Sequence, residues 1–422
     1  MLSARGLYTL MLRLAVPLLL ARLWWRGLRE PGYRRHVAER FGRYDKLPSR
    51  RVIWVHAVSV GEARAAAPLV QALQRRYPDH SVLMTCMTAA GRDTVAQLYG
   101  DAVRCAFLPY DLPGAMRRFL RHFRPALGIM IETEVWPNML AICRAQGVPL
   151  MLANARMSKQ SARGYRRFAA LSRPAFEGFS AVCAQDRNAA RRLRALGARR
   201  MALCGNLKFD VQPDAAKAEE GRALGAALRG RHVLLLASTR EGEEKMLLDA
   251  LGDKHDRSLI VIVPRHQKRF EDVAEILAAR GLTFARRSLG EAPHEGRRVL
   301  LGDTMGEMSF YFALATVAII GGSFRPLGGQ NLIEASAAGV PVIVGPHMFN
   351  FAETTRLAVE SGAAVQVADA AEAIRVARDL LASADRRARM ALAALKLCAA
   401  HRGATERNLT VARILLRVPA PG

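Results

Sequence analysis

Short apolar runs rich in β-branched residues alternate along the chain with longer segments whose apolar residues recur at helical spacing. The first series of runs covers Val52–His56, Ser81–Thr85, Val103–Phe107, Ala126–Ile131, Pro149–Ala153, Ala181–Ala184 and Met201–Cys204. The second covers Val233–Ala237, Leu259–Val263, Val299–Leu301, Val317–Ile320, Val340–Val344 and Ala364–Val367. Strands separated by helices in this way predict parallel sheets with right-handed crossovers. We therefore predict an α/β chain whose two doubly wound, Rossmann-like domains face each other across a cleft.

The division into domains follows from the segment between the two series. Residues 209–230 contain Pro213, small residues and charges, a composition typical of a linker. A chain of 422 residues is long enough for two or three domains. We predict an N-terminal apolar segment at 1–30, a first Rossmann-like domain at 31–208 and a second at 209–422, which ends in terminal helices.

The chain begins with a strongly apolar segment, Leu7–Trp25, that is interrupted by Arg13 and Pro17. A membrane-spanning helix needs about 20 predominantly apolar residues, so this segment is a marginal span. Trp24, Trp25 and the arginines beside them suit the boundary between lipid and water. We expect the segment to anchor the chain to an anionic membrane surface, with the arginine-rich flank and the following domains on the cytoplasmic side. The alternative is an ordinary buried first helix.

Composition and charge limit the partners and the kinds of site that we expect for the chain. The chain carries 63 basic and 37 acidic residues, a net charge of +26, which suits an anionic partner such as a membrane surface or a phosphorylated substrate. No basic block interleaved with aromatic residues is present, so we expect no nucleic-acid partner. The six cysteines form no CxxC pair and the ten histidines no HxxxH pair, which predicts neither a disulfide frame nor a metal site.

Charged residues follow several strands of the first series, at the carboxyl ends where doubly wound folds bind ligands. Glu62 lies where the turn after the first strand enters a helix, and a carboxylate there can accept a proton from a substrate hydroxyl. The alternative is that it only complements the helix dipole. Glu132 and Glu134 follow another buried strand, where such charge is costly unless it is functional or paired. Lys208 follows the last strand, and a structural salt bridge to Asp210 or to another carboxylate is its alternative.

The second series contains a glycine-rich loop, Gly321–Gly329, between a strand and a helix expected to begin near Gln330. The helix N-terminus offers unpaired N–H groups to an anion. Asn331 and Glu334 are expected on one face of that helix, where the carboxylate can accept from ribose hydroxyls. Arg240 and Arg265 follow two other strands and are expected to complete a cationic nucleotide pocket. Taken singly, these loops are also compatible with plain tight turns and solvated surface charges.

Eight stretches occur together in an order that resembles one known family. They are His56–Glu62, Leu108–Pro113, Glu132–Asn138, Asn154–Ser158, Gly205–Asp210, Val263–His266, Gly302–Glu307 and Gly329–Glu334. Between about residues 30 and 360 the chain is similar to the 3-deoxy-D-manno-oct-2-ulosonic acid (Kdo) transferases of lipopolysaccharide biosynthesis. Gln267 departs from a common proline and Gln330 from a frequent histidine.

The resemblance implies a GT-B glycosyltransferase that moves Kdo from CMP-Kdo to a lipid A precursor (lipid IVA) at the inner membrane, by metal-independent, inverting transfer without a cofactor. It implies an acceptor-binding first domain and a CMP-sugar-binding second domain. Glu62 matches the general base, Glu132 and Lys208 match residues that stabilise the transition state, and Ser59, Gly61 and Glu134 lie on the acceptor side. The implied CMP site comprises Arg240, Pro264, Arg265, Met305, Gly306, Glu307, Asn331, Leu332, Ile333 and Glu334.

Two alternatives stay open at the level of sequence. Another GT-B enzyme that acts on a UDP-sugar and a lipid-linked acceptor would share the fold and the glycine loop. A non-catalytic basic protein that binds an anionic membrane or nucleic acid would show salt-sensitive binding but no dependence on Glu62.

Overall fold

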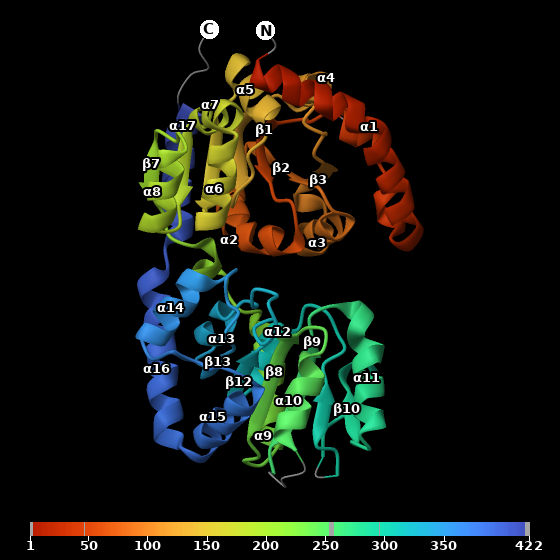
Figure 1. Ribbon diagram of the computed structural model, residues 1–422, viewed down its shortest axis with the longest axis vertical. Coiled ribbons are helices and arrows are strands. Elements are labelled where there is room, and N and C mark those ends of the chain that lie inside the picture. The colour runs from red at the N-terminus through yellow and green to blue at the C-terminus, as the bar shows by residue number, and fades with distance from the viewer. Residues whose placement is uncertain (1–2, 46, 253–256, 295, 418–422) are drawn as a thin grey trace. The chain divides into compact units, whose positions relative to one another are not determined.

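The computed structural model describes residues 3–45, 47–252, 257–294 and 296–417. The chain forms two compact α/β units, one of Met1–Val211 with Arg402–Gly422 and one of Gln212–His401 (Figure 1). Each unit consists of a parallel sheet with helices, as the alternating pattern predicted.

The first unit is built on a seven-stranded parallel sheet of order β3-β2-β1-β4-β5-β6-β7. The strand order reverses between β1 and β4, which makes their carboxyl ends the switch point where doubly wound folds bind ligands. The strands are β1 Arg51–His56, β2 His80–Cys86, β3 Arg104–Phe107, β4 Pro125–Ile131, β5 Leu150–Ala155, β6 Ala181–Ala184 and β7 Met201–Leu203. The helices are α1 Ala4–Arg29, η1 Pro31–Tyr33, η2 Val37–Phe41, α2 Val60–Arg76, α3 Ala89–Tyr99, η3 Gly100–Ala102, α4 Pro113–Phe123, α5 Pro137–Ala145, α6 Lys159–Arg167, α7 Ala169–Glu177, α8 Arg187–Ala195, η4 Leu207–Asp210 and α17 Ala404–Arg417.

The second unit repeats the design with the sheet order β10-β11-β9-β8-β12-β13-β14 and a switch point between β8 and β12. Its strands are β8 Val233–Thr239, β9 Leu259–Pro264, β10 Phe284–Arg286, β11 Val299–Leu301, β12 Val317–Ile320, β13 Val342–Val344 and β14 Ala364–Gln366. Its helices are α9 Ala215–Ala227, α10 Glu243–Leu251, η5 Gln267–Arg269, α11 Phe270–Ala279, η6 Arg287–Leu289, α12 Met308–Leu314, α13 Ile333–Ala337, α14 Ala352–Glu360, α15 Ala370–Ala382 and α16 Ala384–His401.

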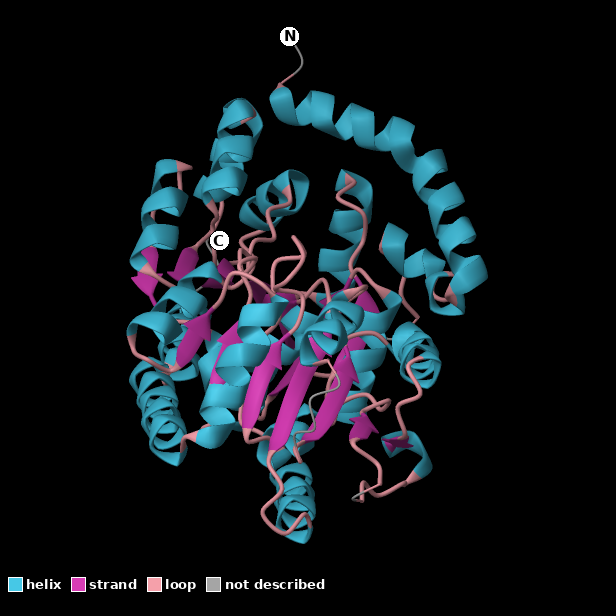
Figure 2. Cartoon of the chain, turned by 60° about the horizontal axis from the view of Figure 1, so that its bottom comes forward, coloured by secondary structure: helices cyan, strands magenta, loops and turns pink. Residues whose placement is uncertain are grey.

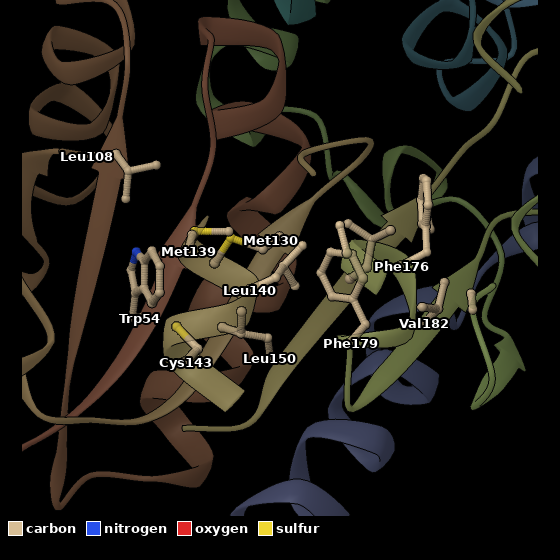
Figure 3. Packing of buried hydrophobic residues seen from close by; sticks show 14 of the residues in the cluster. Trp54, Leu108, Met130, Met139, Leu140, Cys143, Leu150, Phe176, Phe179 and Val182 are labelled. Atoms are coloured by element: carbon tan, nitrogen blue, oxygen red, sulfur yellow. The ribbon is translucent and has the colours of Figure 1, made fainter. Parts of the chain in front are cut away.

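Both faces of each sheet are covered by helices, which is why the strands are almost continuously apolar (Figure 2). In β1, Trp54 packs into the core on one face of the sheet, while Ile53 and Val55 pack into the core on the other. Figure 3 shows the first of these cores, where Trp54 lies with Met130 and Met139. The sheet thereby becomes a rigid frame whose loops at the carboxyl ends carry the polar residues.

The domain boundaries differ from those predicted. The predicted linker at 209–230 contains α9, and the two units meet at Val211/Gln212. Residues up to 422 were expected in the second domain, but α17 packs against α2 and η4 of the first unit, with Leu415 in the core there. The carboxylate of Asp210 fixes the return of the chain by accepting the N–H groups of Gly403 and Thr405. A helical pattern predicts α17 itself but not the sheet that its apolar face covers.

The N-terminal segment is a single helix, α1, that forms part of the first unit and not a separate domain. By length and composition it is the one helix of the described residues that is able to cross a membrane. The row formed by Tyr8, Leu12, Leu19 and Leu23 is half-buried or buried against the unit. The opposite side of α1 exposes a row of large apolar residues, Leu7, Met11, Leu14, Leu18 and Trp25. Residues 1–2 of the predicted anchor lie outside the described part of the chain.

Strand β10 is absent from the prediction. It is three residues long, Phe284-Ala-Arg286, and it lies at the edge of the second sheet beside β11. The equally short β11 was predicted because Val299–Leu301 is continuously apolar, whereas Phe284–Arg286 has one buried side chain and ends in an arginine.

Candidate active site

Glu62 lies in the first turn of α2, directly after β1 and therefore at the switch point of the first sheet. One carboxylate oxygen, Oε2, accepts the backbone N–H of Val58 at 2.6 Å. The other, Oε1, is 3.5 Å from the hydroxyl of Ser59. Glu62 thus has the helix-terminus contact that the structural alternative requires, yet Oε1 is only loosely bonded.

Glu132 follows β4 on the other side of the switch point and is held between two cations. Lys208 Nζ lies 3.0 Å from Oε1, and Arg156 Nε lies 2.6 Å from Oε2. Burial alone would raise the pKa of Glu132, but the charges of Lys208 and Arg156 lower it below its ordinary value. The backbone of Glu132 is left-handed, with φ 65°, a conformation that is strained for a glutamate. The structural alternative predicted for Lys208, a salt bridge to a nearby carboxylate, is formed, with Glu132 as the partner instead of Asp210, which binds the turn before α17.

Glu134 and His56 form a third part of the cluster. The Trp136 indole donates to Glu134 Oε2 at 2.9 Å, and His56 Nε2 lies 4.0 Å from the same oxygen. His56 is fully buried, its Nδ1 lies 2.9 Å from the hydroxyl of Thr85, and its Nε2 has no hydrogen-bond partner. Burial lowers the pKa of His56 to about 4, so the ring is neutral. Burial and the charge of Glu132 raise the pKa of Glu134 to about 7.

The surroundings of Glu62 and Glu132 shift the pKa values of the two carboxyl groups in opposite directions. Burial, together with the charges of Glu132 and Glu134, raises the pKa of Glu62 to about 8. Glu132 remains ionised because its two cations compensate for burial. Divergent pKa values of this kind separate a group that exchanges protons from a group that supplies a fixed charge.

The remaining residues predicted on the acceptor side frame Glu62 without binding it tightly. Ser59 is the N-cap residue of α2, but its side chain makes no capping hydrogen bond to the helix. Gly61 is exposed, and a Cβ built on it would meet nothing closer than Ser59 Oγ at 4.0 Å. Open space therefore lies beside the helix turn that carries Glu62.

The junction after β4 depends on a residue that the sequence reading did not single out. The cap of α5 is the carboxylate of Asp111, which accepts the N–H groups of Asn138 and Met139 at 3.0 and 2.7 Å. The cap comes from a distant loop, so local sequence spacing could not identify it. The order Tyr-Asp-Leu-Pro within a matching family stretch was the available signal.

In the second unit, the glycine loop after β12 is braced by Glu243 of α10. Its carboxylate accepts the N–H groups of Gly322 at 2.6 Å, Phe324 at 2.9 Å and Arg240 at 2.9 Å. Gly321 is required by close approach, because a Cβ there would lie 2.6 Å from the carbonyl oxygen of Ser238. The N-cap of α10 is Gly242, and Glu243 binds across to the glycine loop. Glu243 was missed because nothing in the local pattern marks it.

Asn331 and Glu334 come together as predicted, but not on one helix face. Helix α13 begins at Ile333, three residues later than expected, and has five residues. Asn331 Nδ2 donates to Glu334 Oε1 at 2.9 Å, and Asn331 Oδ1 accepts the N–H of Ile333 at 3.1 Å. Leu332 and Ile333 are buried in the core, so only their backbone groups are available to a ligand.

Basic side chains follow the ends of β8 and β9. Arg265 Nε donates to Gln330 Oε1 at 3.1 Å, which links the loop after β9 to the glycine loop. Pro264 ends β9 and is buried, and the N–H of Arg265 binds the carbonyl of Thr239. Arg240 Nε pairs with Glu241 at 3.1 Å. Gln330, which was noted only as a departure from histidine, is thus a structural partner of a predicted donor-site arginine.

The Met305-Gly306-Glu307 turn precedes α12. Its glutamate is held in ion pairs, whereas its first two residues are exposed. Glu307 is engaged by Arg287 and Lys217, whose charges outweigh burial and lower its pKa to about 2. Met305 and Gly306 are exposed, and Gly306 has a left-handed backbone with φ 85°. The structure therefore presents the turn to a ligand but holds the Glu307 carboxylate in an ion-pair network.

No three histidine, cysteine, aspartate or glutamate side chains converge as metal ligands within the described ranges. The cationic groups beside Glu132 and in the loops after β8 and β9 are the charges available to anionic substrates. All six cysteines are free thiols, five of them buried.

Comparisons with known proteins identify the family. A family model described as 3-deoxy-D-manno-octulosonic-acid transferase (kdotransferase) matches residues 35–211. The chain is 48% identical to a 3-deoxy-D-manno-octulosonic acid transferase of Bordetella pertussis, over 96% of this chain and 98% of that protein. It is 36% identical to the transferase of the same name from Haemophilus influenzae, over 96% and 97%.

Among solved structures, a glycosyltransferase from Rickettsia africae has the same fold, with a TM-score of 0.60 at 12% identity, covering 88% of this chain and all of that one. The chain has two Rossmann-like units and a carboxylate cluster at the first switch point. It is also 48% identical to a Kdo transferase over nearly its full length. The chain belongs to the Kdo transferase family and is a GT-B glycosyltransferase.

Proposed function

We propose that the chain transfers Kdo from CMP-Kdo to a phosphorylated lipid A precursor, lipid IVA, with inversion at the anomeric carbon and without a metal ion. The observation that carries the mechanism is the difference between two adjacent carboxylates. Glu62 has a raised pKa and one loosely bonded oxygen, whereas both oxygens of Glu132 are bound by cations. Such a pair supplies a proton acceptor beside a fixed charge.

Glu62 is the general base in this proposal. As the acceptor hydroxyl oxygen bonds to the anomeric carbon, its proton passes to Glu62 Oε1. The bond between that carbon and the phosphate oxygen breaks, and CMP leaves with the electron pair. Attack from the side opposite the leaving group inverts the anomeric centre. A base is most effective when its pKa lies near the working pH, and a value of about 8 meets this condition.

Glu132, Lys208 and Arg156 set the electrostatics of the step. The two cations keep Glu132 ionised, and its negative charge raises the proton affinity of Glu62. Because these charges are fixed before the substrates bind, no reorganisation is needed when charge develops in the transition state. The strained backbone at Glu132 supports this role, because such strain persists only where the surroundings hold it in place.

The second unit provides the donor site in this proposal. Arg240 and Arg265, whose loops are linked to the glycine loop through Glu243 and Gln330, supply positive charge for the CMP phosphate. Glu334, oriented by Asn331, is placed to accept hydrogen bonds from the ribose hydroxyls.

We further propose that α1 attaches the chain to the cytoplasmic face of the inner membrane and lies in the plane of the bilayer surface. Its inner row is in contact with the first unit along most of its length, and Tyr8 and Thr9 donate to Asp111 and Asn138 at 3.1 Å each. A spanning orientation would remove these contacts. The exposed apolar row on the outer side suits the acyl boundary of an anionic bilayer.

The reaction is tested by incubating the full chain with CMP-Kdo and lipid IVA and recording the product by mass spectrometry. The expected product is the acceptor with added Kdo, formed in the presence of a metal chelator. Transfer from a UDP-sugar but not from CMP-Kdo would establish the alternative GT-B donor and overturn the proposal.

The membrane arrangement is tested by flotation with anionic phospholipid vesicles. Leu14→Gln/Leu18→Gln should reduce the vesicle-bound fraction by at least about tenfold, because each buried apolar side chain contributes about 1.5–3 kcal/mol. The control, Leu392→Gln/Leu395→Gln, changes two exposed leucines on α16 of the second unit. Equal flotation of both variants and the unmodified chain would contradict a membrane role for the outer row.

A further inference from the structure

A basic pocket is defined by Lys159, Arg163 and Arg166 of α6 and by Arg191 and Arg192 of α8. Both helices belong to the first unit (Figure 1). Its volume is about 390 Å³. Sites for small molecules usually occupy about 300–1,000 Å³, so the pocket is large enough for a phosphorylated sugar and larger than a phosphate ion needs.

The positive charge of this pocket is not compensated by the helices that form it. Neither α6 nor α8 contains an aspartate or a glutamate. Within the described part of the chain, the side chains of Lys159, Arg163 and Arg166 make neither a hydrogen bond nor an ion pair. Five like charges around one cavity repel each other, and an anion between them removes that repulsion.

The two walls of the pocket differ in rigidity. Arg192 Nη1 donates to the carbonyl of Met157 at 2.7 Å, and Arg191 Nη2 donates to Asn188 Oδ1 at 3.2 Å. The α8 wall is therefore held in place, whereas the three α6 cations are exposed and free to close on a ligand. Guanidinium groups bind phosphate through paired hydrogen bonds, which makes a phosphate group the ligand that best fits this set.

The lining of the pocket also includes three apolar residues, Ala162, Ala195 and Leu196. A free ion gains nothing from these apolar residues, but the ring face of a sugar or the start of an acyl chain does. The lining thus suits a phosphate that is attached to a larger, partly apolar molecule.

The pocket is joined to the catalytic cluster by consecutive residues. Arg156 donates to Glu132, and its own carbonyl accepts from Thr133 at 2.6 Å. The next residue, Met157, binds the pocket through Arg192. Lys159 follows two residues later, and because consecutive Cα atoms are about 3.8 Å apart, it lies within about 11 Å of Arg156.

We propose that this basic pocket binds a phosphate monoester on the sugar headgroup of the acceptor and thereby positions the acceptor hydroxyl at Glu62. The proposal rests on the proposed function, which makes the acceptor a phosphorylated lipid. Phospholipid headgroups carry the same chemical group and are the competing source.

The test compares Arg163→Ala/Arg166→Ala with the control Arg117→Ala/Arg121→Ala in the full-length chain. Both variants remove two exposed arginines from a helix of the first unit. Kdo transfer is measured in detergent micelles on lipid IVA and on the same lipid after phosphatase treatment. The pocket variant should raise KM for lipid IVA by about 10- to 100-fold, the effect of losing hydrogen bonds to a charged group. Its kcat, its KM for CMP-Kdo and its KM for the dephosphorylated lipid should stay within about threefold of the unmodified chain.

Flotation with anionic vesicles separates the two sources of phosphate. Loss of vesicle binding in the pocket variant, with unchanged KM values in micelles, would assign the pocket to bulk phospholipid and overturn the acceptor site. Equal KM increases on both acceptors, or in the control variant, would overturn it as well.

A readout without catalysis separates this proposal from the proposed reaction. The unmodified chain should broaden the ³¹P resonance of glucosamine 1-phosphate, and the pocket variant should not. If Kdo transfer fails but this difference is observed, the phosphate pocket stands and the reaction does not. If transfer succeeds but the broadening is equal in both proteins, the pocket is not the phosphate site.

Discussion

The two units place a glutamate at equivalent positions and use it in opposite ways. Glu62 lies in the first turn of α2 after β1, and Glu243 lies in the first turn of α10 after β8. Glu243 is fully buried and accepts three backbone N–H groups. Glu62 accepts one, beside two other carboxylates. A carboxylate whose hydrogen bonds are saturated holds a loop, whereas one with a weakly bonded oxygen is available for chemistry.

This difference has a consequence for stability. The folded-state pKa of Glu62, about 8, lies above its unfolded value, so the folded chain binds a proton that the unfolded chain has released between those two values. Stability is therefore lost as the pH rises from about 4.5 to about 8, which is the sign expected for a raised carboxyl pKa. Glu62 is thus a destabilising residue at neutral pH, as groups retained for catalysis often are.

The largest effect on folding is expected at the structural glutamate. Glu243→Ala leaves the N–H groups of Gly322 and Phe324 buried without partners, at about 1–3 kcal/mol each, so the free energy of unfolding should fall by about 2–6 kcal/mol. Urea titration followed by circular dichroism measures this change. Glu241→Ala, at an exposed position two residues before it, should change the free energy of unfolding by less than about 0.5 kcal/mol. Equal stability of both variants would remove the bracing role of Glu243.

The second effect is expected at Lys208, through the charge that it holds. Lys208→Met removes one cation from Glu132, which should slow Kdo transfer by about 10- to 100-fold through loss of a charge-assisted hydrogen bond. Because the pKa of Glu132 is lowered in the folded state, its stabilisation is present above the ordinary value of about 4.3 and is lost at lower pH.

The melting temperatures of Lys208→Met and the unmodified chain should accordingly differ at pH 7 and converge below about pH 4. Lys208→Arg keeps the charge and is the matched control. A difference that does not depend on pH would show that Lys208 acts by packing and not through the charge of Glu132.

The third prediction concerns the CMP site proposed in the second unit. Glu334→Ala should weaken CMP binding by about 1–3 kcal/mol, because its partner Asn331 and the ribose lose an acceptor. Calorimetry measures the affinity, with UMP as the reference ligand for base selectivity. Unchanged CMP affinity in a folded variant would exclude Glu334 from the site, and tight UMP binding would favour the alternative donor.

The smallest effect is expected at Ser59. Its hydroxyl is 3.5 Å from Glu62 Oε1, at the limit of a hydrogen bond, so Ser59→Ala should change kcat/KM by less than about threefold. A larger loss, measured under the same assay conditions, would show that the serine orients the base in the substrate complex.

Much of the fold could be predicted because its signals are local. The apolar run of β1 predicts a strand buried on both faces, and the observed strand contains the predicted residues Val52–His56. The sequence pattern predicts a helix at α17 but does not show which of the two sheets its apolar face covers. The position of α17 was therefore not predictable. Strand β10 was missed because Phe284–Arg286 ends in an arginine and lacks the continuous apolar run of the equally short β11.

The candidate site also combines residues that the sequence predicts with residues that only tertiary contacts bring in. Glu62, Glu132 and Lys208 stand at strand ends, and parallel topology alone brings strand ends together. The partners that tune them come from tertiary contacts: Arg156 at Glu132, His56 near Glu134 and Asp111 at α5. Asn331 and Glu334 meet, as predicted, but they do not lie on the same helix. Helix α13 begins at Ile333, and Asn331 precedes it and accepts the N–H of Ile333.

The central claim, that Glu62 is the general base, is tested most directly by the pH dependence of kcat/KM for Kdo transfer, recorded between pH 5 and 9.5 for the unmodified chain and Glu62→Gln. Glutamine preserves size and hydrogen bonding to Val58 but accepts no proton. The unmodified chain should gain activity with rising pH and level off above about 8, the pKa of Glu62. Glu62→Gln should be about 10²–10⁴-fold slower, should lose this limb, and should bind CMP and fold at least as well. Activity of Glu62→Gln within a few-fold of the unmodified chain, with the limb retained, would contradict the account and make Glu134 the next candidate base, because both oxygens of Glu132 are already bound.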